Sequence, residues 1–523
     1  MPKKTAAIRT AAAMMAITLL GKALGLLRDS LAGSYFGTQS VEGAAFNFAS
    51  TLPRNLLDFM FASAISASFI PLFNEALEKD GKKAAMDLGR SFMSLIFFLS
   101  TAATAICIIF AEPMVALYAG KNVETVPIAT ELARIMFPII IVSCLAFSST
   151  GILQSLGEFN IPAAMGLACN IVIVGYFFLF MDRFGVRGLS WAYLAGWAMQ
   201  MVIQIPFLLK EGHSFIPRID FKDERLKRIG ILMLPVMASS WVAPVNSLVN
   251  GKAALMDANG VASYNAVMYA NTLHSVISGV FVLTVSNIML PRFSSLAARH
   301  EEGEFRDSLS DSLKVILFIT IPMALGLAAL SGPLVSLVYE RGNFNEISTR
   351  LTGSALAYFS LGMPAFGAMT ILSRGFFAMQ EGKTPMLAGF AAMAANFALS
   401  FALVPYMGPG GPALASSVSM AVAALWMGIS MSRKLKGFAN KKSLIEIGKS
   451  LIGAIACAGA ALALERALSG IGNGLLIKLV CLAASAGVGV LAYVGVTLLL
   501  RQEQAAAMVK MIKAHPKFKN GMR

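Results

Sequence analysis

Long apolar runs constrain this chain more than any other feature of its sequence. The chain is 57% hydrophobic and only 14% charged, whereas an average soluble domain is about 25% charged. A helix needs about 20 apolar residues to cross a bilayer. Because the runs lack the strict alternation of membrane strands, we predict an all-α integral membrane protein with about 14 transmembrane helices. The runs lie near residues 10–35, 43–72, 88–111, 127–153, 159–181, 188–209, 229–250, 261–290, 310–331, 350–373, 384–407, 411–432, 446–464 and 475–500.

The chain also repeats itself. Short strings around two prolines return with both prolines shifted by 220 residues, namely Pro71 to Pro291 and Pro113 to Pro333. A duplicated apolar chain is typical of two-lobed transporters. Each copy holds six predicted helices, an even number. The two copies therefore share one orientation, as parallel repeats do.

The repeat predicts the organisation of the chain. We expect an N-lobe of helices 1–6, a C-lobe of helices 7–12, two extra C-terminal helices and a basic cytoplasmic tail. These four parts cover residues 1–212, 213–436, 437–502 and 503–523.

Basic residues predict the topology. With the N-terminus inside, 31 of the 43 Lys and Arg residues fall on cytoplasmic segments, eight fall on outside connections and the rest lie deeper within the runs, when a basic residue among the first or last five of a run is counted with the adjoining connection. The positive-inside rule therefore favours cytoplasmic N- and C-termini. Lys22, Arg28 and Asp29 interrupt the first run, so we interpret it as a retained helix and not as a cleaved signal peptide.

Several classes of function lack their signatures. The five cysteines all lie in apolar runs, without CxxC or metal spacing, which is typical of small buried residues. Phosphate-loop, dinucleotide and nucleophile-elbow motifs are absent from the sequence. No basic patch is interleaved with aromatic residues as nucleic-acid binding would require. We expect a transporter with no metal and no cofactor.

Charged residues gather in the first two runs. Lys22, Arg28 and Asp29 lie in run 1, and Arg54 and Asp58 in run 2. A charge at bilayer depth costs about 2.5–3.5 kcal/mol on insertion scales, so it faces a wet cavity or a partner. One interpretation is an ion pair, Arg28–Asp58 or Arg54–Asp29, that only fixes packing. The other is a cationic cavity for an anionic headgroup, because guanidinium groups bind phosphate bidentately.

Other polar residues within the runs are weaker candidates. Glu131 and Arg134 are three apart, a spacing that predicts a local ion pair. Gly21 and Gly25 predict close helix packing. The remaining polar side chains fit interhelical hydrogen bonds or cavity lining, with His274 more typical of packing than of proton transfer; they are Asn170, Gln200, Gln204, Asn246, Asn250, His274, Asn287 and Asn396.

A family resemblance rests on ordered motifs. The string Gly21-Lys-Ala-Leu-Gly25-Leu-Leu-Arg28-Asp29, followed by Tyr35-Phe36-Gly37, resembles the first-helix signature of the MurJ/MviN lipid II flippases. Further matching strings, in order along nearly the whole chain, are Leu52-Pro53, Ser66-Ala-Ser68-Phe69-Ile-Pro71, Leu290-Pro291, Arg341-Gly342-Asn-Phe344 and Gly375-Phe-Phe-Ala-Met-Gln-Glu-Gly-Lys-Thr384-Pro385.

The resemblance implies a function. The cargo would be lipid II, an undecaprenyl-pyrophosphate carrying the peptidoglycan precursor, moved from the inner to the outer leaflet of the bacterial plasma membrane by alternating access. Lys22, Arg28 and Asp29 match charged family positions, and Arg54 lies near another. Helices 13 and 14 would form a groove for the lipid tail. Cell-wall synthesis proteins are expected partners, and the membrane potential or ions would drive the cycle.

The sequence departs from the family in helix 8. Thr272 and Ser275 stand where the family often has Arg and Glu, so the first lobe would supply most of the anion binding. The alternatives are a flippase for another polyprenyl-linked saccharide, a drug or cation antiporter of the MATE type, and an integral-membrane glycosyltransferase. The last would need a large extramembrane loop with paired carboxylates.

The predicted topology can be tested with two cysteine substitutions. Lys121→Cys should react with an impermeant thiol reagent on intact cells, and Lys222→Cys should react only after the cells are opened, because the first lies outside and the second inside. The five native cysteines provide the background signal. Equal labelling of both positions on intact cells would rule out the scheme.

Overall fold

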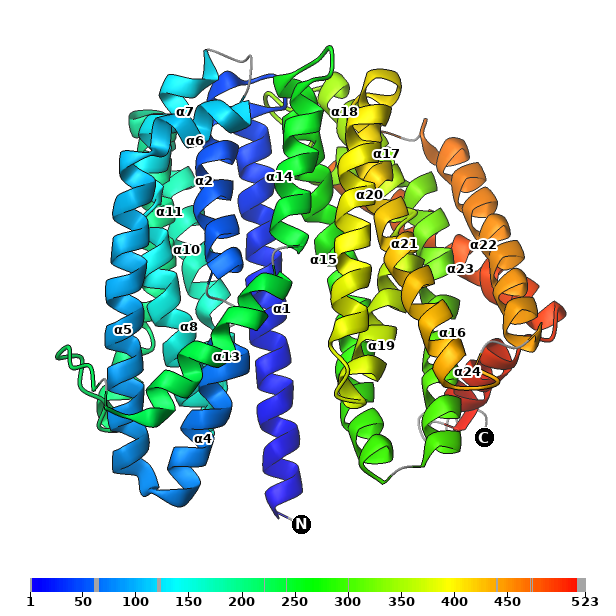
Figure 1. Cartoon of the computed structure of the whole chain (residues 1–523). Coiled ribbons are helices and arrows are strands. Elements are labelled where there is room, and N and C mark those ends of the chain that lie inside the picture. The colour runs from blue at the N-terminus through cyan, green and yellow to red at the C-terminus, as the bar shows by residue number, and fades with distance from the viewer. Residues whose placement is uncertain are drawn as a thin grey trace. The chain divides into compact units, whose positions relative to one another are not determined.

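The computed structural model in Figure 1 is built from helices throughout the part of the chain that it describes. It describes residues 2–60, 65–119, 124–220, 222–240, 242–299, 301–438, 441–470, 472 and 474–514.

The described chain divides into two compact units. Unit 1 comprises Met1–Leu248 and Arg341–Asn343, and unit 2 comprises Val249–Glu340 and Phe344–Arg523. Helix α13 packs against α2, η1 and α5, so the start of the second predicted lobe belongs with unit 1. The division into six plus six helices stays a prediction.

Unit 1 contains one π-helical turn, η1, among its α-helices. Its elements are α1 (Pro2–Phe36), α2 (Val41–Met60), η1 (Ile65–Phe69), α4 (Ile70–Lys79), α5 (Gly81–Ile109), α6 (Ala111–Ala119), α7 (Thr125–Met136), α8 (Ile139–Ser155), α9 (Asn160–Ala163), α10 (Met165–Leu179), α11 (Met181–Val202), α12 (Ile205–Lys210) and α13 (Glu224–Ser240). Helix α14 (Val242–Leu255) runs across the division between the units.

Unit 2 contains the remaining helices. They are α15 (Val261–Ala298), α16 (Glu302–Ala329), α17 (Ser331–Tyr339), α18 (Glu346–Ser360), α19 (Met363–Ala378), α20 (Lys383–Met407), α21 (Gly410–Lys434), α22 (Lys441–Leu468), α23 (Leu475–Leu499) and α24 (Glu503–Ala514).

Each predicted apolar run falls on one helix or on two or three consecutive ones, so the all-α membrane fold is confirmed. Within the described residues, nine helices are long and apolar enough to cross a membrane, or ten if the bent pair α18 and α19 forms one span. The count of 14 spans stays a prediction.

The sequence repeat reappears as a repeat of helix breaks. Helix α5 ends at Ile109 and α6 covers Ala111–Ala119, whereas α16 ends at Ala329 and α17 covers Ser331–Tyr339. The shift is again 220 residues. Phe110 N–H donates to the Ile106 carbonyl at 2.9 Å, and Leu330 N–H donates to the Gly326 carbonyl at 3.0 Å. The duplicated Glu/Gly-Pro string therefore encodes the same break twice.

The two units also share a pattern of helix neighbours. In unit 1, α10 packs on α11, α5 on α8, and α11 on α7 and α8. In unit 2, α20 packs on α21, α16 on α19, and α21 on α18 and α19. These are the corresponding helices of the two sequence copies. The duplication predicted from the proline strings thus recurs in the packing inside each unit.

The connection after α12 is fastened to α5. Arg90 Nε donates to the Ile216 carbonyl at 2.7 Å, and Arg218 N–H donates to Ser94 Oγ at 3.0 Å. His213 is buried beside this contact, and burial, with a smaller effect of the Arg90 charge, lowers the pKa of its imidazole to about 4. The imidazole is therefore neutral at physiological pH, and the connection is part of the unit 1 structure (Figure 1).

Candidate substrate-binding site

The close approach of α1 to α10 creates the candidate site in unit 1. A methyl group at Gly21 would lie 3.2 Å from the Leu167 backbone nitrogen, and one at Gly25 would lie 3.2 Å from Asn170 Nδ2. Any larger residue would push the two helices apart. The predicted packing role of Gly21 and Gly25 is confirmed.

Asn170 on α10 links the α1 backbone to a guanidinium group. Its Nδ2 donates to the Gly21 carbonyl at 2.9 Å, and its Oδ1 accepts from Arg28 Nη1 at 3.0 Å. The first bond fixes the orientation of the amide, because only the Nδ2 end can donate to a carbonyl. The oxygen end is therefore turned toward Arg28.

Arg28 is held from two further directions. Its Nε donates to Asp29 Oδ1 at 2.9 Å, and its Nη2 lies 2.8 Å from the same oxygen. The Tyr193 ring on α11 lies under the guanidinium, with Arg28 Cζ 5.6 Å from the ring centroid. A cation over an aromatic face is favourable, most of all where water is excluded. Arg28 is thus pre-oriented and only 22% exposed.

The guanidinium has bonding capacity left over. An arginine carries five N–H donors, and the contacts to Asp29 and Asn170 use three of them. One donor remains on each of Nη1 and Nη2. Two N–H groups on one planar fork match two oxygens of a phosphate. The group is anchored but still able to bind an anion.

The other predicted cations lie in the same unit. Arg54 on α2 is exposed, and its charge acts on the Tyr193 phenol together with those of Arg28 and Asp29. Lys22 is partly buried, about two turns before Asp29 on α1. The side chain of Asp58 lies outside the described residues. The pair observed for Arg28 is therefore with Asp29, and the predicted Arg54–Asp29 pair is not seen among the described contacts.

Sequence reasoning missed part of this site. Asn170 was predicted to make interhelical hydrogen bonds or to line a cavity, and it does bond to α1, but nothing linked it to Arg28. Tyr193 gave no signal, because an aromatic residue in an apolar run normally packs in the core. The predicted Glu131–Arg134 pair is wrong. Glu131 pairs instead with Arg187 of α11, with 2.7 Å between Oε1 and Nε.

The second-lobe candidates on α15 do not form a charged site in unit 2. The Thr272 hydroxyl donates to the Met268 carbonyl one turn earlier, and Ser275 is exposed. His274 is buried and stacks on Phe359, and its Nε2 has no partner within the described structure. Packing, as expected, is the role that its contacts support.

The two asparagines of α14 differ from each other. Asn246 belongs to unit 1 and is partly buried, with no partner for its Oδ1 among the described residues. Asn250 belongs to unit 2, where its Nδ2 donates to Ser416 Oγ at 2.7 Å and its Oδ1 accepts from Ser400 at 3.2 Å. Asn250 therefore joins α14 to α20 and α21 through neutral hydrogen bonds.

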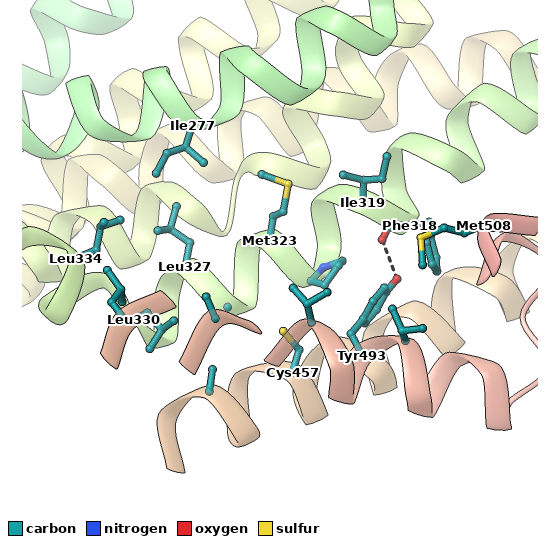
Figure 2. A pocket seen from close by; sticks show the side chains of 17 residues that line it. Ile277, Phe318, Ile319, Met323, Leu327, Leu330, Leu334, Cys457, Tyr493 and Met508 are labelled. Carbon is teal, nitrogen blue, oxygen red and sulfur yellow. Dashed lines mark hydrogen bonds between the residues drawn. The ribbon is translucent and has the colours of Figure 1, made fainter. Parts of the chain in front are cut away.

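An apolar cavity of about 470 Å³ lies inside unit 2. Figure 2 shows the side chains that line it, with Met508 of α24 near one end. Ile277 comes from α15, Phe318–Leu327 from α16, Leu334 from α17, Cys457 and Ala461 from α22, and Leu482–Val494 from α23, and Leu330 lies between α16 and α17. The Tyr493 hydroxyl donates to the Phe318 carbonyl at 2.7 Å, so this polar group is already satisfied.

The cavity includes the two C-terminal helices predicted to form a lipid-tail groove. Its opposite wall is α16. This helix was not predicted to take part, because its sequence is as apolar as the other predicted spans. Lys478 on α23 lies one turn before the lining residue Leu482. Its Nζ donates to Ser336 Oγ at 2.8 Å and lies 3.7 Å from Glu340. These polar contacts tie α23 to α17.

Most of the chain matches one known protein family. The sequence model of the family described as "Lipid II flippase MurJ" matches residues 32–502. The chain belongs to this family. Similar curated members include the "Probable lipid II flippase MurJ" of Rhizobium tropici, 30% identical over 80% of this chain and 79% of the relative. The protein of the same name from Vibrio cholerae is 24% identical over 93% and 94% of the two chains.

Solved structures agree in fold. A structure entitled "Lipid II flippase MurJ, inward closed conformation" matches with a TM-score of 0.76 and 24% identity, over 93% of this chain and 98% of that one. An inward-facing multidrug resistance MATE family transporter of the MOP superfamily matches with a TM-score of 0.68 and 15% identity, over 82% and 100% of the chains. Both likenesses concern the fold, and the first spans more of the chain.

The Asn170 contacts can be tested directly. Asn170→Leu keeps the size of the side chain but removes both hydrogen bonds, which should cost about 1–3 kcal/mol because a buried carbonyl and a guanidinium lose a partner. We expect a lower melting temperature in detergent and weaker support of growth in a complementation assay. Ile171→Ala, on the exposed side of the same helix, is the matched control. An Asn170→Leu protein that is as stable and active as the control would contradict this role.

Proposed function

We propose that this protein moves lipid II from the cytoplasmic to the outer leaflet of the bacterial inner membrane. The observation that carries the proposal is family membership over residues 32–502, which include both α22 and α23. It is a multi-pass membrane protein, and the proposed topology places both termini in the cytoplasm. Its activity is transport and involves no covalent chemistry.

In this proposal Arg28 binds the pyrophosphate of the cargo. Its two remaining N–H groups can donate to phosphate oxygens, and Lys22 and Arg54 add positive charge in the same unit. Asp29 holds the guanidinium in place and lowers the net charge of the site. A fully cationic pocket would bind a pyrophosphate too tightly to release it, so the carboxylate favours turnover.

The apolar cavity of unit 2 would hold part of the polyprenyl tail. Burial of apolar surface stabilises by about 25 cal/mol per Å². The Tyr493 hydroxyl in the lining already donates to the Phe318 carbonyl, so it does not need a polar ligand. The tail would thus remain in an apolar environment while the headgroup crosses the membrane.

The driving force would be the membrane potential acting on the cationic site, or a coupled ion. Moving one charge through 100 mV is worth about 2.3 kcal/mol. An inside-negative potential would favour return of the unloaded cationic site toward the cytoplasm in an alternating-access cycle. Proteins of cell-wall synthesis are the proposed partners on either side of the transport step.

The other candidate cargoes receive less support. A drug or cation antiporter would need an uncompensated carboxylate for its cationic cargo, whereas Asp29 is paired with Arg28. The MATE transporters share the fold at 15% identity. A flippase for another polyprenyl-linked saccharide would use the same phosphate contacts, so the cargo sugar must be settled by experiment.

The proposal predicts a large effect at Arg28. Arg28→Ala should abolish growth of cells depleted of their own lipid II flippase, because the pre-oriented phosphate ligand is lost. Arg28→Lys should rescue only partly, since a point charge cannot make the bidentate contact. Membrane levels of each variant are measured by immunoblot.

Thr272→Ala is the control for Arg28→Ala. The Thr272 hydroxyl is already bonded to the Met268 carbonyl, so its removal should be mild. Normal growth with Arg28→Ala and failure with Thr272→Ala would place the site in the second lobe and overturn the assignment. Failure of the wild-type protein to replace the native flippase would reject lipid II as the cargo.

The tail cavity predicts a second sensitive position. Ala486→Trp should fill the space beside α16 and reduce lipid II transport several-fold, measured with labelled lipid in proteoliposomes. Ala484→Trp, on the same helix but outside the cavity lining and exposed, should have little effect. Equal transport by the two variants would show that the cavity does not hold the tail.

A further inference from the structure

A second cavity, in unit 1, has no part in the site described above. It has a volume of about 410 Å³ and lies among α6, α7 and α11. It is lined by Glu112, Val126, Pro127, Thr130, Glu131, Arg134, Ile135, Arg187 and Trp191. Trp191 and Tyr193 are two residues apart on α11, which places them about 200° apart around the helix. The cavity and Arg28 therefore lie on opposite sides of α11.

Its depth corresponds to a membrane interface. The span Thr125–Ser155 has 31 residues, or about 46 Å of helix, against a hydrocarbon core of about 30 Å. If it is centred, each end extends about 8 Å beyond the core. Arg134 lies about 13 Å along from Thr125, close to the boundary between headgroups and acyl chains. Trp191, 57% exposed, is the residue type that concentrates at this level.

The charges of the cavity are balanced but not all paired. Glu131 and Arg187 neutralise each other across α7 and α11 at 2.7 Å. Arg134 and Glu112 face the same cavity, yet neither side chain has an ion pair or hydrogen bond among the described residues. One cation and one carboxylate are thus left over. A ligand that carries one negative and one positive group would satisfy both.

A buried hydroxyl also lacks a partner. Thr130 is 5% exposed, its Oγ1 is buried without a hydrogen bond in the described structure, and its side chain lines the cavity. Leaving such a group unsatisfied costs about 1–3 kcal/mol. Thr130 and Arg134 are four apart on α7 and so lie on one face of the helix. A phosphate placed beside Arg134 could accept from both side chains.

We propose that this cavity binds the zwitterionic headgroup of a membrane phospholipid that carries a phosphate and an amine, as phosphatidylethanolamine does. The phosphate would contact Arg134 and Thr130, and the ammonium would contact Glu112. Val126, Pro127 and Ile135 would face the glycerol and the first acyl carbons. By the predicted topology the lipid belongs to the outer leaflet. The inference does not depend on lipid II being the cargo.

Native mass spectrometry of the full-length protein in detergent tests the site. We expect the wild-type protein to bind phosphatidylethanolamine more tightly than phosphatidylglycerol of the same chain length. Arg134→Gln should weaken phosphatidylethanolamine binding at least about 10-fold, as expected for a charged hydrogen bond, and Thr130→Val about 5-fold. Arg466→Gln, an exposed arginine of unit 2, should leave binding unchanged.

Glu112→Gln tests the proposed contact with the lipid ammonium group. It should weaken binding of the amine lipid and strengthen binding of phosphatidylglycerol, because only the former needs a carboxylate. Soluble glycerophosphoethanolamine should compete poorly, since it lacks acyl chains. Equal binding of both lipids by the wild-type protein, full competition by the soluble headgroup, or unchanged binding in correctly folded Arg134→Gln would each overturn the proposal. Melting temperatures of the variants establish their folding.

Discussion

A charge that lies within the membrane must be held by partners that the protein supplies, and this requirement explains the structure around Arg28. Its guanidinium is bonded to Asp29 and Asn170 and lies over Tyr193. Asn170 can reach it only because α1 and α10 approach closely at Gly21 and Gly25. Two glycines thus determine where the charge lies, although neither contacts it.

The two units use polar groups differently. In unit 1 the buried hydrogen bonds converge on a cation that retains donors for an anion. In unit 2 Asn250 bonds to Ser416 and Ser400, and these neutral groups satisfy one another across three helices. The second network stabilises packing, and the apolar cavity beside α16 offers a surface for hydrocarbon. The proposed headgroup contacts in unit 1 and the proposed tail cavity in unit 2 are the two kinds of surface that an amphipathic lipid requires.

Periodicity and composition predicted most of the fold, because a 20-residue apolar run has few structures available in a bilayer. The Arg28–Asp29–Lys22 cluster was also visible, since charges within such runs are rare. Contacts between distant segments were not predictable. Glu131 was predicted to form an ion pair with Arg134, three residues away, but it forms one with Arg187 of another helix. The contact of Tyr193 with Arg28 and the position of α16 in the cavity wall likewise depend on tertiary packing, which cannot be inferred from a single sequence.

The repeated helix break bears on the evolution of the chain. The interruption between α5 and α6 recurs between α16 and α17 at the same offset as the proline strings. A feature that both halves share at equivalent positions was inherited from the half-length ancestor that was duplicated. Arg28 with its amide and tyrosine, and the neutral network around Asn250, differ between the halves. The helix breaks therefore date from before the duplication, and the Arg28 cluster and the Asn250 network reflect divergence of the two copies after it.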